Sequence, residues 1–163
     1  MKVIKLGFSF SVLLILLVAV AFTVDGQGKT VNPANEIALS AQGQQSGQFN
    51  APDLTVSYTY NRTGGAMQLS GNVQFGMSIQ ANYAVVQTFH LGVTLVDAQG
   101  NVLGEQGITS AFGANVGDTI DFSTSVVVPS QVAAMVFTYS GQAYSIGRGG
   151  SNPTNFWFNP FTK

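Results

Sequence analysis

The sequence contains no cysteine and a single histidine, and only 8% of its 163 residues carry a charge. The absence of cysteine excludes disulfides, thiolate metal sites and cysteine nucleophiles. A zinc site needs several nitrogen, sulfur or carboxylate ligands, and His90 is the one imidazole. Calcium needs about six to eight oxygen ligands, and the acidic residues are dispersed. We therefore expect no metal and no cofactor.

Charge is far below the roughly 25% of ordinary soluble domains. After residue 24 the only cations are Lys29, Arg62, Arg148 and Lys163, against seven acidic residues. Because no basic patch is present, nucleic acid is excluded as a partner. A nearly uncharged surface also opposes self-association only weakly. We expect the partner to be the protein itself or another surface protein.

The usual catalytic arrangements are also missing. Serine hydrolysis needs a nucleophile, a base and an orienting acid, and His90 is the only histidine base. The glycine-containing stretches 43–47 and 147–151 lack the spacing of a nucleophile elbow and of a phosphate loop, respectively. Asp118 and Asp121 are three residues apart, which places them on opposite faces of a strand. We predict that the protein is not an enzyme.

The N-terminal segment 1–24 has the pattern of an export signal. Lys2 and Lys5 precede an uncharged, largely aliphatic run over residues 6–24, and such lysines keep their end of the segment in the cytoplasm. Ala19-Val20-Ala21 matches the small-x-small pattern of signal cleavage, whereas the run is close to the ~20 residues that span a bilayer. Both a cleaved signal peptide and an uncleaved signal anchor remain open, and either forms an apolar helix at the membrane.

Residues 25–53 are rich in Gly, Gln, Asn and Ser, which predicts a flexible linker with one short strand at 36–40. Residues 54–163 then form one domain. Apolar and polar residues alternate over 54–60, 67–75, 89–96 and 120–128, the signature of half-buried strands. Residues 132–139 are apolar on both faces and predict a central strand, and 144–146 and 156–158 are short candidates. Turn signals separate these runs, so we predict an antiparallel β-sandwich of seven or eight strands.

Part of this pattern resembles a known family. Gly71-Asn72-Val73, followed by a hydrophobic strand from Val93 that ends at Asp97, a turn at Gly100 and a return strand through Val102 and Leu103, is similar to the FxLyD domains. The resemblance covers residues 66–128, and Val96 occupies the position of the family's tyrosine. It implies an immunoglobulin-like sandwich on a bacterial surface and supplies no catalytic residues.

Two local features are candidate sites. Phe156, Trp157 and Phe158 form an aromatic tail that we interpret mainly as a last core strand; in the alternative, the three aromatics contact a ligand. Asn61-Arg62-Thr63 is a glycosylation sequon, expected in a loop and relevant only in a host that glycosylates it.

These observations predict a non-catalytic extracytoplasmic structural or interaction module that associates with copies of itself. It is either anchored in the membrane and faces the periplasm or exterior, or is secreted after signal cleavage. The alternative is a carbohydrate- or peptide-binding module that uses the C-terminal aromatics.

Export is tested by fusing reporters after Lys163. Because Lys2 and Lys5 orient the apolar run, a reporter that works only outside the cytoplasm should be active. A fusion that is active only inside the cytoplasm would contradict the prediction.

Overall fold

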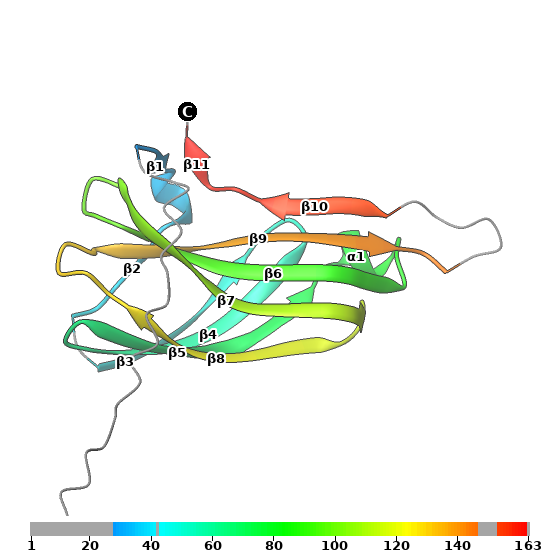
Figure 1. The fold of residues 1–163 in the computed structure, drawn as a ribbon, viewed down its shortest axis with the longest axis horizontal. Helices are drawn as coiled ribbons and strands as arrows, with labels where there is room; N and C mark the ends of the chain where they lie inside the picture. The colour runs from blue at the N-terminus through cyan, green and yellow to red at the C-terminus, as the bar shows by residue number, and fades with distance from the viewer. Residues whose placement is uncertain (1–27, 42, 147–152, 163) are drawn as a thin grey trace, which may run out of the picture.

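A computed structural model describes residues 28–41, 43–146 and 153–162 (Figure 1). The predicted export segment 1–24 and the glycine-rich stretch 147–151 lie outside these residues. The described chain is all-β, with antiparallel pairing throughout, a one-turn helix α1 (Met77–Gln80) and a short 3-10 helix η1 (Pro33–Asn35).

Two sheets pack face to face. Sheet 1 is made, in order across it, of β3 (Gly43–Asn50), β4 (Leu54–Thr63), β5 (Ala66–Phe75) and β8 (Thr119–Val127). Sheet 2 is made of β10 (Thr154–Phe158), β9 (Ala134–Tyr144), β6 (Val85–Val96) and β7 (Val102–Asn115), and β2 (Ile37–Ala38) pairs with the start of β9. At one end of the molecule, β1 (Thr30–Val31) pairs with β11 (Phe161–Thr162).

The alternating runs of the sequence form the strands predicted for them. In β6, Phe89, Leu91, Val93 and Leu95 are buried on the face toward sheet 1. The strand predicted to be central, β9, does lie between β6 and the pair of shorter strands β2 and β10. The expected turn at 97–100 is also present: Gly100 N–H donates to the carbonyl of Asp97, and Gly100 has a φ of 79°, which glycine adopts without strain.

The structure differs from the sequence-based expectation in two places. Gly43–Asn50, which we expected to belong to a linker, is a regular strand paired along its whole length with β4. β7 continues to Asn115, far beyond the short return strand that the sequence indicated. Both stretches are rich in Gly, Gln, Ser, Thr and Ala, and such a composition is more typical of turns and linkers than of strands.

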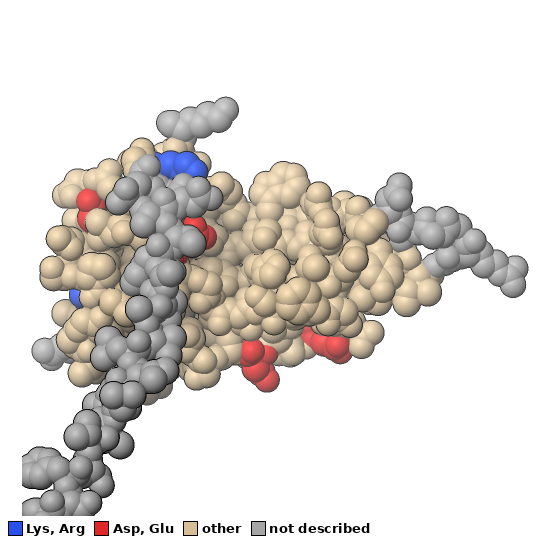
Figure 2. All heavy atoms as spheres, viewed as in Figure 1, with Lys and Arg blue, Asp and Glu red and all other residues tan. Residues whose placement is uncertain are grey.

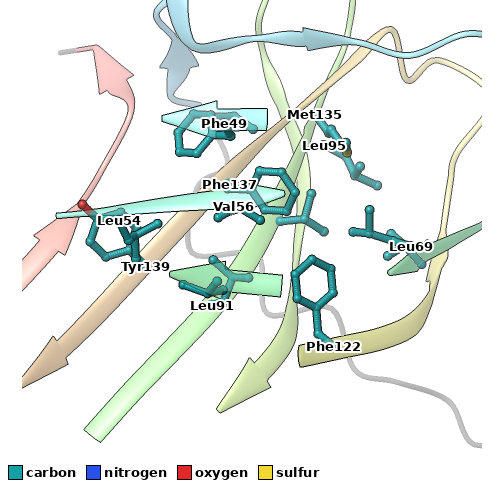
Figure 3. Close-up of a cluster of buried hydrophobic side chains, with 14 of the residues drawn as sticks. Phe49, Leu54, Val56, Leu69, Leu91, Leu95, Phe122, Met135, Phe137 and Tyr139 are labelled. Carbon is teal, nitrogen blue, oxygen red and sulfur yellow. The ribbon is translucent and has the colours of Figure 1, made fainter. Parts of the chain in front are cut away.

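The core between the sheets is aromatic at its centre (Figure 3). The ring of Phe137 lies 5.6 Å from that of Phe49 and 5.5 Å from that of Tyr58, so β9 is joined to β3 and β4. Phe75 of sheet 1 meets Phe89 of sheet 2 edge to face at 5.2 Å. Such aromatic pairs add about 0.5–1.5 kcal/mol to the free energy gained from burial alone.

The C-terminal strand β10 divides its aromatic residues between the two faces of sheet 2. Phe156 is buried and its ring packs against Phe75 and Phe89, and Phe158 packs against Phe49. Phe156 pairs with Gly141, where a side chain would collide with its ring. Trp157 points the other way and is 66% exposed. The interpretation of this strand as core therefore holds for Phe156 and Phe158, and Trp157 remains on the surface.

This division predicts opposite effects for neighbouring substitutions. Phe156→Ala should lower the free energy of unfolding by about 3–5 kcal/mol, because it leaves a cavity between the sheets. Trp157→Ala should change it by less than about 1 kcal/mol, because the indole is outside the core. Chemical denaturation of both variants measures the difference. Equal stabilities would contradict the arrangement of β10.

Candidate functional site

The solvent-facing side of sheet 2 carries a row of side chains that crosses all four of its long strands. The pairing registers place Trp157 opposite Ser140, Ser140 opposite His90, and His90 opposite Ser110. Residues opposite one another in a ladder share a face, so the four side chains form one line. His90 Nδ1 and Ser110 Oγ are 2.8 Å apart, within hydrogen-bonding distance. The row holds an exposed indole and an exposed imidazole on a rigid support.

A groove of about 950 Å³, which we call the outer groove, lies beside this row. Trp157, His90 and Ser140 line it on the side of the row, and Gly92 and Gly107 contribute backbone to its floor. A Cβ atom added to Gly107 would meet nothing within 4 Å. The depression therefore lies over Gly107, whereas the Thr138 hydroxyl occupies the space above Gly92.

Glu105 supplies the negative charge of the outer groove. Its Oε1 accepts a hydrogen bond of 2.9 Å from the hydroxyl of Thr138, which reaches across β6 above Gly92. The carboxylate is half-buried, and its second oxygen is not used in that bond. This arrangement fixes a hydrogen-bond acceptor at the floor of the groove.

The end of the groove near the start of β7 is bounded by the paired chain ends. The carbonyl of Lys29 accepts a hydrogen bond from the N–H of Val102, and the Lys29 ammonium lies 5.1 Å from the centre of the Phe161 ring. Both Lys29 and Phe161 line the groove. Thr30 and Thr162 hold β1 to β11 through hydroxyl groups 2.5 Å apart. This wall of the groove thus depends on residues from opposite ends of the described chain.

A smaller hollow of about 390 Å³ lies on the other side of the Trp157–His90 row. Gln142 and Asn155 line it, and Gln142 Nε2 donates to Asn155 Oδ1 at 2.9 Å. Trp157 and His90 border both depressions. The indole of Trp157 is therefore accessible to a ligand from both depressions, which lie on either side of it.

The opposite face of the molecule, on sheet 1, is covered by uncharged polar side chains. In one row across the sheet, Ser46, Thr59, Ser70 and Ser123 are opposite one another, and the hydroxyls of Ser46 and Thr59 are 2.9 Å apart. Asp121 is the only charged side chain on this face that comes from β3, β5 or β8. Figure 2 likewise shows few charged side chains on the visible side of the molecule.

β3 lies at the border of sheet 1. Among the described residues it pairs only with β4, so its other edge has no partner strand there. The strand contains no charged residue and no proline. Phe49 is its one buried residue, Gly47 is half-buried, and the other residues are exposed. We call this border, formed by Gly43–Asn50, the β3 edge.

The remaining candidate residues do not converge. Asp118 accepts hydrogen bonds from Asn115 and closes the turn between β7 and β8, while Asp121 is exposed in β8, so both have the structural roles of ordinary turn and strand residues. Asn61 is exposed, but it lies within β4 and not in the expected loop. No group of three or more potential metal ligands occurs among the residues that the structure describes.

One buried polar contact connects the core to the loop before β4. The Tyr139 hydroxyl donates to Asp53 Oδ2 at 3.0 Å, and the Ser78 hydroxyl lies 3.2 Å from the other carboxylate oxygen. Burial raises the pKa of the Tyr139 phenol strongly, and the nearby Asp53 carboxylate raises it further. The phenol therefore stays protonated and continues to donate well above its ordinary range.

Comparison with known proteins gives no relative from which to assign this site: no protein-family model, curated protein or solved structure matches the chain. Within residues 28–41, 43–146 and 153–162, no helix is sufficiently long and apolar to traverse a membrane. The geometry described above is therefore the basis on which a function can be proposed.

The Tyr139–Asp53 contact predicts a pH-dependent contribution to stability. Tyr139→Phe should lower the free energy of unfolding by about 1.5–3 kcal/mol near neutral pH, as for other hydrogen bonds to charged groups. In the unfolded chain the pKa of the phenol is about 10, below its pKa in the folded protein. The contribution of Tyr139 to the free energy of unfolding is therefore complete below pH 10 and declines as the pH rises above 10.

In denaturant titrations, the difference in free energy of unfolding between wild type and Tyr139→Phe should therefore become smaller above pH 10. Tyr83→Phe is the control, because it removes the hydroxyl of another half-buried tyrosine whose contacts do not include Asp53. A gap that is constant up to pH 11 would rule out this linkage.

Proposed function

We propose that the protein is an exported, non-catalytic, immunoglobulin-like module that assembles with copies of itself through the β3 edge. Residues 1–24 direct its export and either anchor it at the membrane or are removed on secretion. The observation that carries the self-association is the β3 edge: an eight-residue, uncharged strand with an unpaired border in the described chain.

The strand order supports the immunoglobulin-like fold. If β4 to β10 are numbered as seven consecutive strands, the first, second and fifth belong to sheet 1 and the third, sixth and seventh to sheet 2. Immunoglobulin domains divide these six strands in the same way. Here the fourth strand, β7, joins sheet 2, and β3 adds a border to sheet 1.

Sheet borders normally carry features that prevent pairing with another chain, such as proline, charge, bulges or a covering segment. β10 is flanked by Pro153 and Pro160, which have no N–H to donate. β7 carries Glu105 and has register shifts against β6, and β8 contacts β7 across the two sheets. The β3 edge has none of these features within the described residues, which favours it as the border that pairs.

Pairing of two β3 strands about a two-fold axis would be antiparallel and would place the same face of both sheets outward. With the axis near Gly47, Ser46 of one copy would lie opposite Gln48 of the other, and neither side chain carries a charge. Backbone N–H and C=O groups would provide the affinity, as in other cases of strand addition. The result would be a continuous eight-stranded sheet.

The natural absence of cysteine allows a direct test on the full chain in its host. Ser46→Cys should yield a cross-linked dimer with a short bifunctional thiol reagent, because residues near the two-fold axis lie within about 4.5–8 Å of their counterparts. Ser70→Cys is the matched control: the same substitution on the same face, but on β5 inside the sheet.

A second pair of variants tests whether the cross-link requires pairing of the two β3 strands or only the proximity of two copies. Ser46→Cys combined with Gln48→Lys should lose the dimer, because the two lysines would lie diagonally across the new ladder, about 7–8 Å apart, and repel each other. Combination with Gln74→Lys on β5 should retain it. Cross-linking that is absent from Ser46→Cys, or equal in Ser46→Cys and Ser70→Cys, would refute association through the β3 edge.

A further inference from the structure

We propose that the outer groove binds a neutral oligosaccharide, with a sugar ring stacked on Trp157. This site lies on sheet 2, on the opposite side of the molecule from sheet 1, and it does not depend on pairing of the β3 edge. The argument rests on the indole, on the polar lining and on the shape of the groove.

Trp157 is placed as a platform, not as a mobile surface side chain. It is 66% exposed, while Phe156 and Phe158 on either side pack between the sheets and fix its backbone. The chain contains one tryptophan, and its indole is left in water although burial of aromatics is strongly favourable. The C–H bonds on one face of a pyranose ring carry partial positive charge and match the negative face of an indole.

The groove lining offers hydrogen-bond donors and acceptors in the mixture that hydroxyl groups require. Ser140 and His90 stand beside Trp157, and Glu105 presents a carboxylate already oriented by Thr138. A carboxylate accepts from two hydroxyls at once, and serine and imidazole both donate and accept. Each sugar hydroxyl can therefore find a partner without burying an unsatisfied group.

The same lining disfavours other ligand classes. The groove contains one cation, Lys29, and one anion, Glu105, so it has no net charge with which to select a polyanion or a polycation. A lipid chain would need a continuous apolar wall, whereas the apolar lining from Leu91, Trp157, Phe158 and Phe161 shares the groove with Glu105, Thr138 and Ser140. A neutral ligand that is rich in hydroxyl groups needs neither a net charge nor a continuous apolar wall.

The dimensions indicate a chain of sugars and not a single ring. The outer groove, at about 950 Å³, is near the upper end of the roughly 300–1,000 Å³ of small-molecule sites. The hollow lined by Gln142 and Asn155 continues the polar surface on the other side of Trp157. The indole would thus contact one ring near the middle of a bound oligosaccharide.

The single tryptophan makes the experiment direct. The full chain is titrated with neutral hexasaccharides of glucose, N-acetylglucosamine, mannose and xylose, and the fluorescence of Trp157 is followed. At least one series should shift the emission in a saturable manner, and affinity electrophoresis in gels containing the matching polysaccharide should retard the protein.

Three variants locate the binding by electrophoretic retardation, which needs no tryptophan. Trp157→Ala should weaken binding at least tenfold, and Gly107→Leu should do the same by filling the groove without removing a contact. Met77→Ala, an equally exposed apolar residue on α1 outside the groove, should bind as wild type does. Circular dichroism checks that each variant is folded.

Each contrary result overturns the proposal. Binding of none of the four hexasaccharides at millimolar concentration, or binding that Trp157→Ala and Gly107→Leu leave unchanged, excludes a glycan site here. A displayed peptide library that is retained through Trp157 when the sugars are not would assign the groove to peptides. None of these results affects cross-linking through Ser46→Cys, so the two proposals fail separately.

Discussion

The contact between the two sheets is the interaction on which the rest of the molecule depends. The chain has no cysteine to form disulfides and few charged residues to form ion pairs, so burial of apolar side chains must provide most of the stability. Phe137 and Phe89 are the centres of this contact, each with aromatic neighbours on the opposite sheet. Because burying such a side chain contributes about 1.5–3 kcal/mol, the aromatic core compensates for the lack of other constraints. It also holds β10 in place, and with it the outward-facing Trp157.

The sequence predicts those parts of the fold in which polarity alternates with the strand period. β4, β5, β6 and β8 have large apolar residues on one face, whereas β9 is indicated by a run that is apolar on both faces. The two-residue period of a strand likewise separates Phe156 from Trp157 in β10. β3 escaped prediction because a border strand with one solvent-facing side needs few apolar residues, and Phe49 is the one buried side chain in it. The second half of β7 has the same property. Composition alone does not distinguish such strands from linkers.

The outer groove could not be predicted from sequence spacing. Its row joins Trp157 to Ser140, His90 and Ser110, and only the pairing registers of three separate ladders bring these residues into line. The facing glycines at 92 and 107 are likewise opposite each other only because the register between β6 and β7 shifts by one residue at Ile108. Residue types gave one usable signal, an isolated tryptophan between two phenylalanines. The low charge of the chain, by contrast, was evident from the start, and it gives both the sheet 1 face and the groove their neutral chemistry.

The pairing of β1 with β11 has a mechanical consequence. For a chain tethered through its N-terminal segment, any pull enters the domain at Lys29 and Thr30. There β1 is held by two residue pairs to β11 and by a few backbone contacts with residues 100–102. So short a ladder separates at a lower force than the ladders of β4 and β6, in which many residue pairs would have to break at once. Separation of β1 from β11 would therefore disrupt the wall of the groove that Lys29 and Phe161 form. Tension on the tether would alter the groove while the two sheets remained packed.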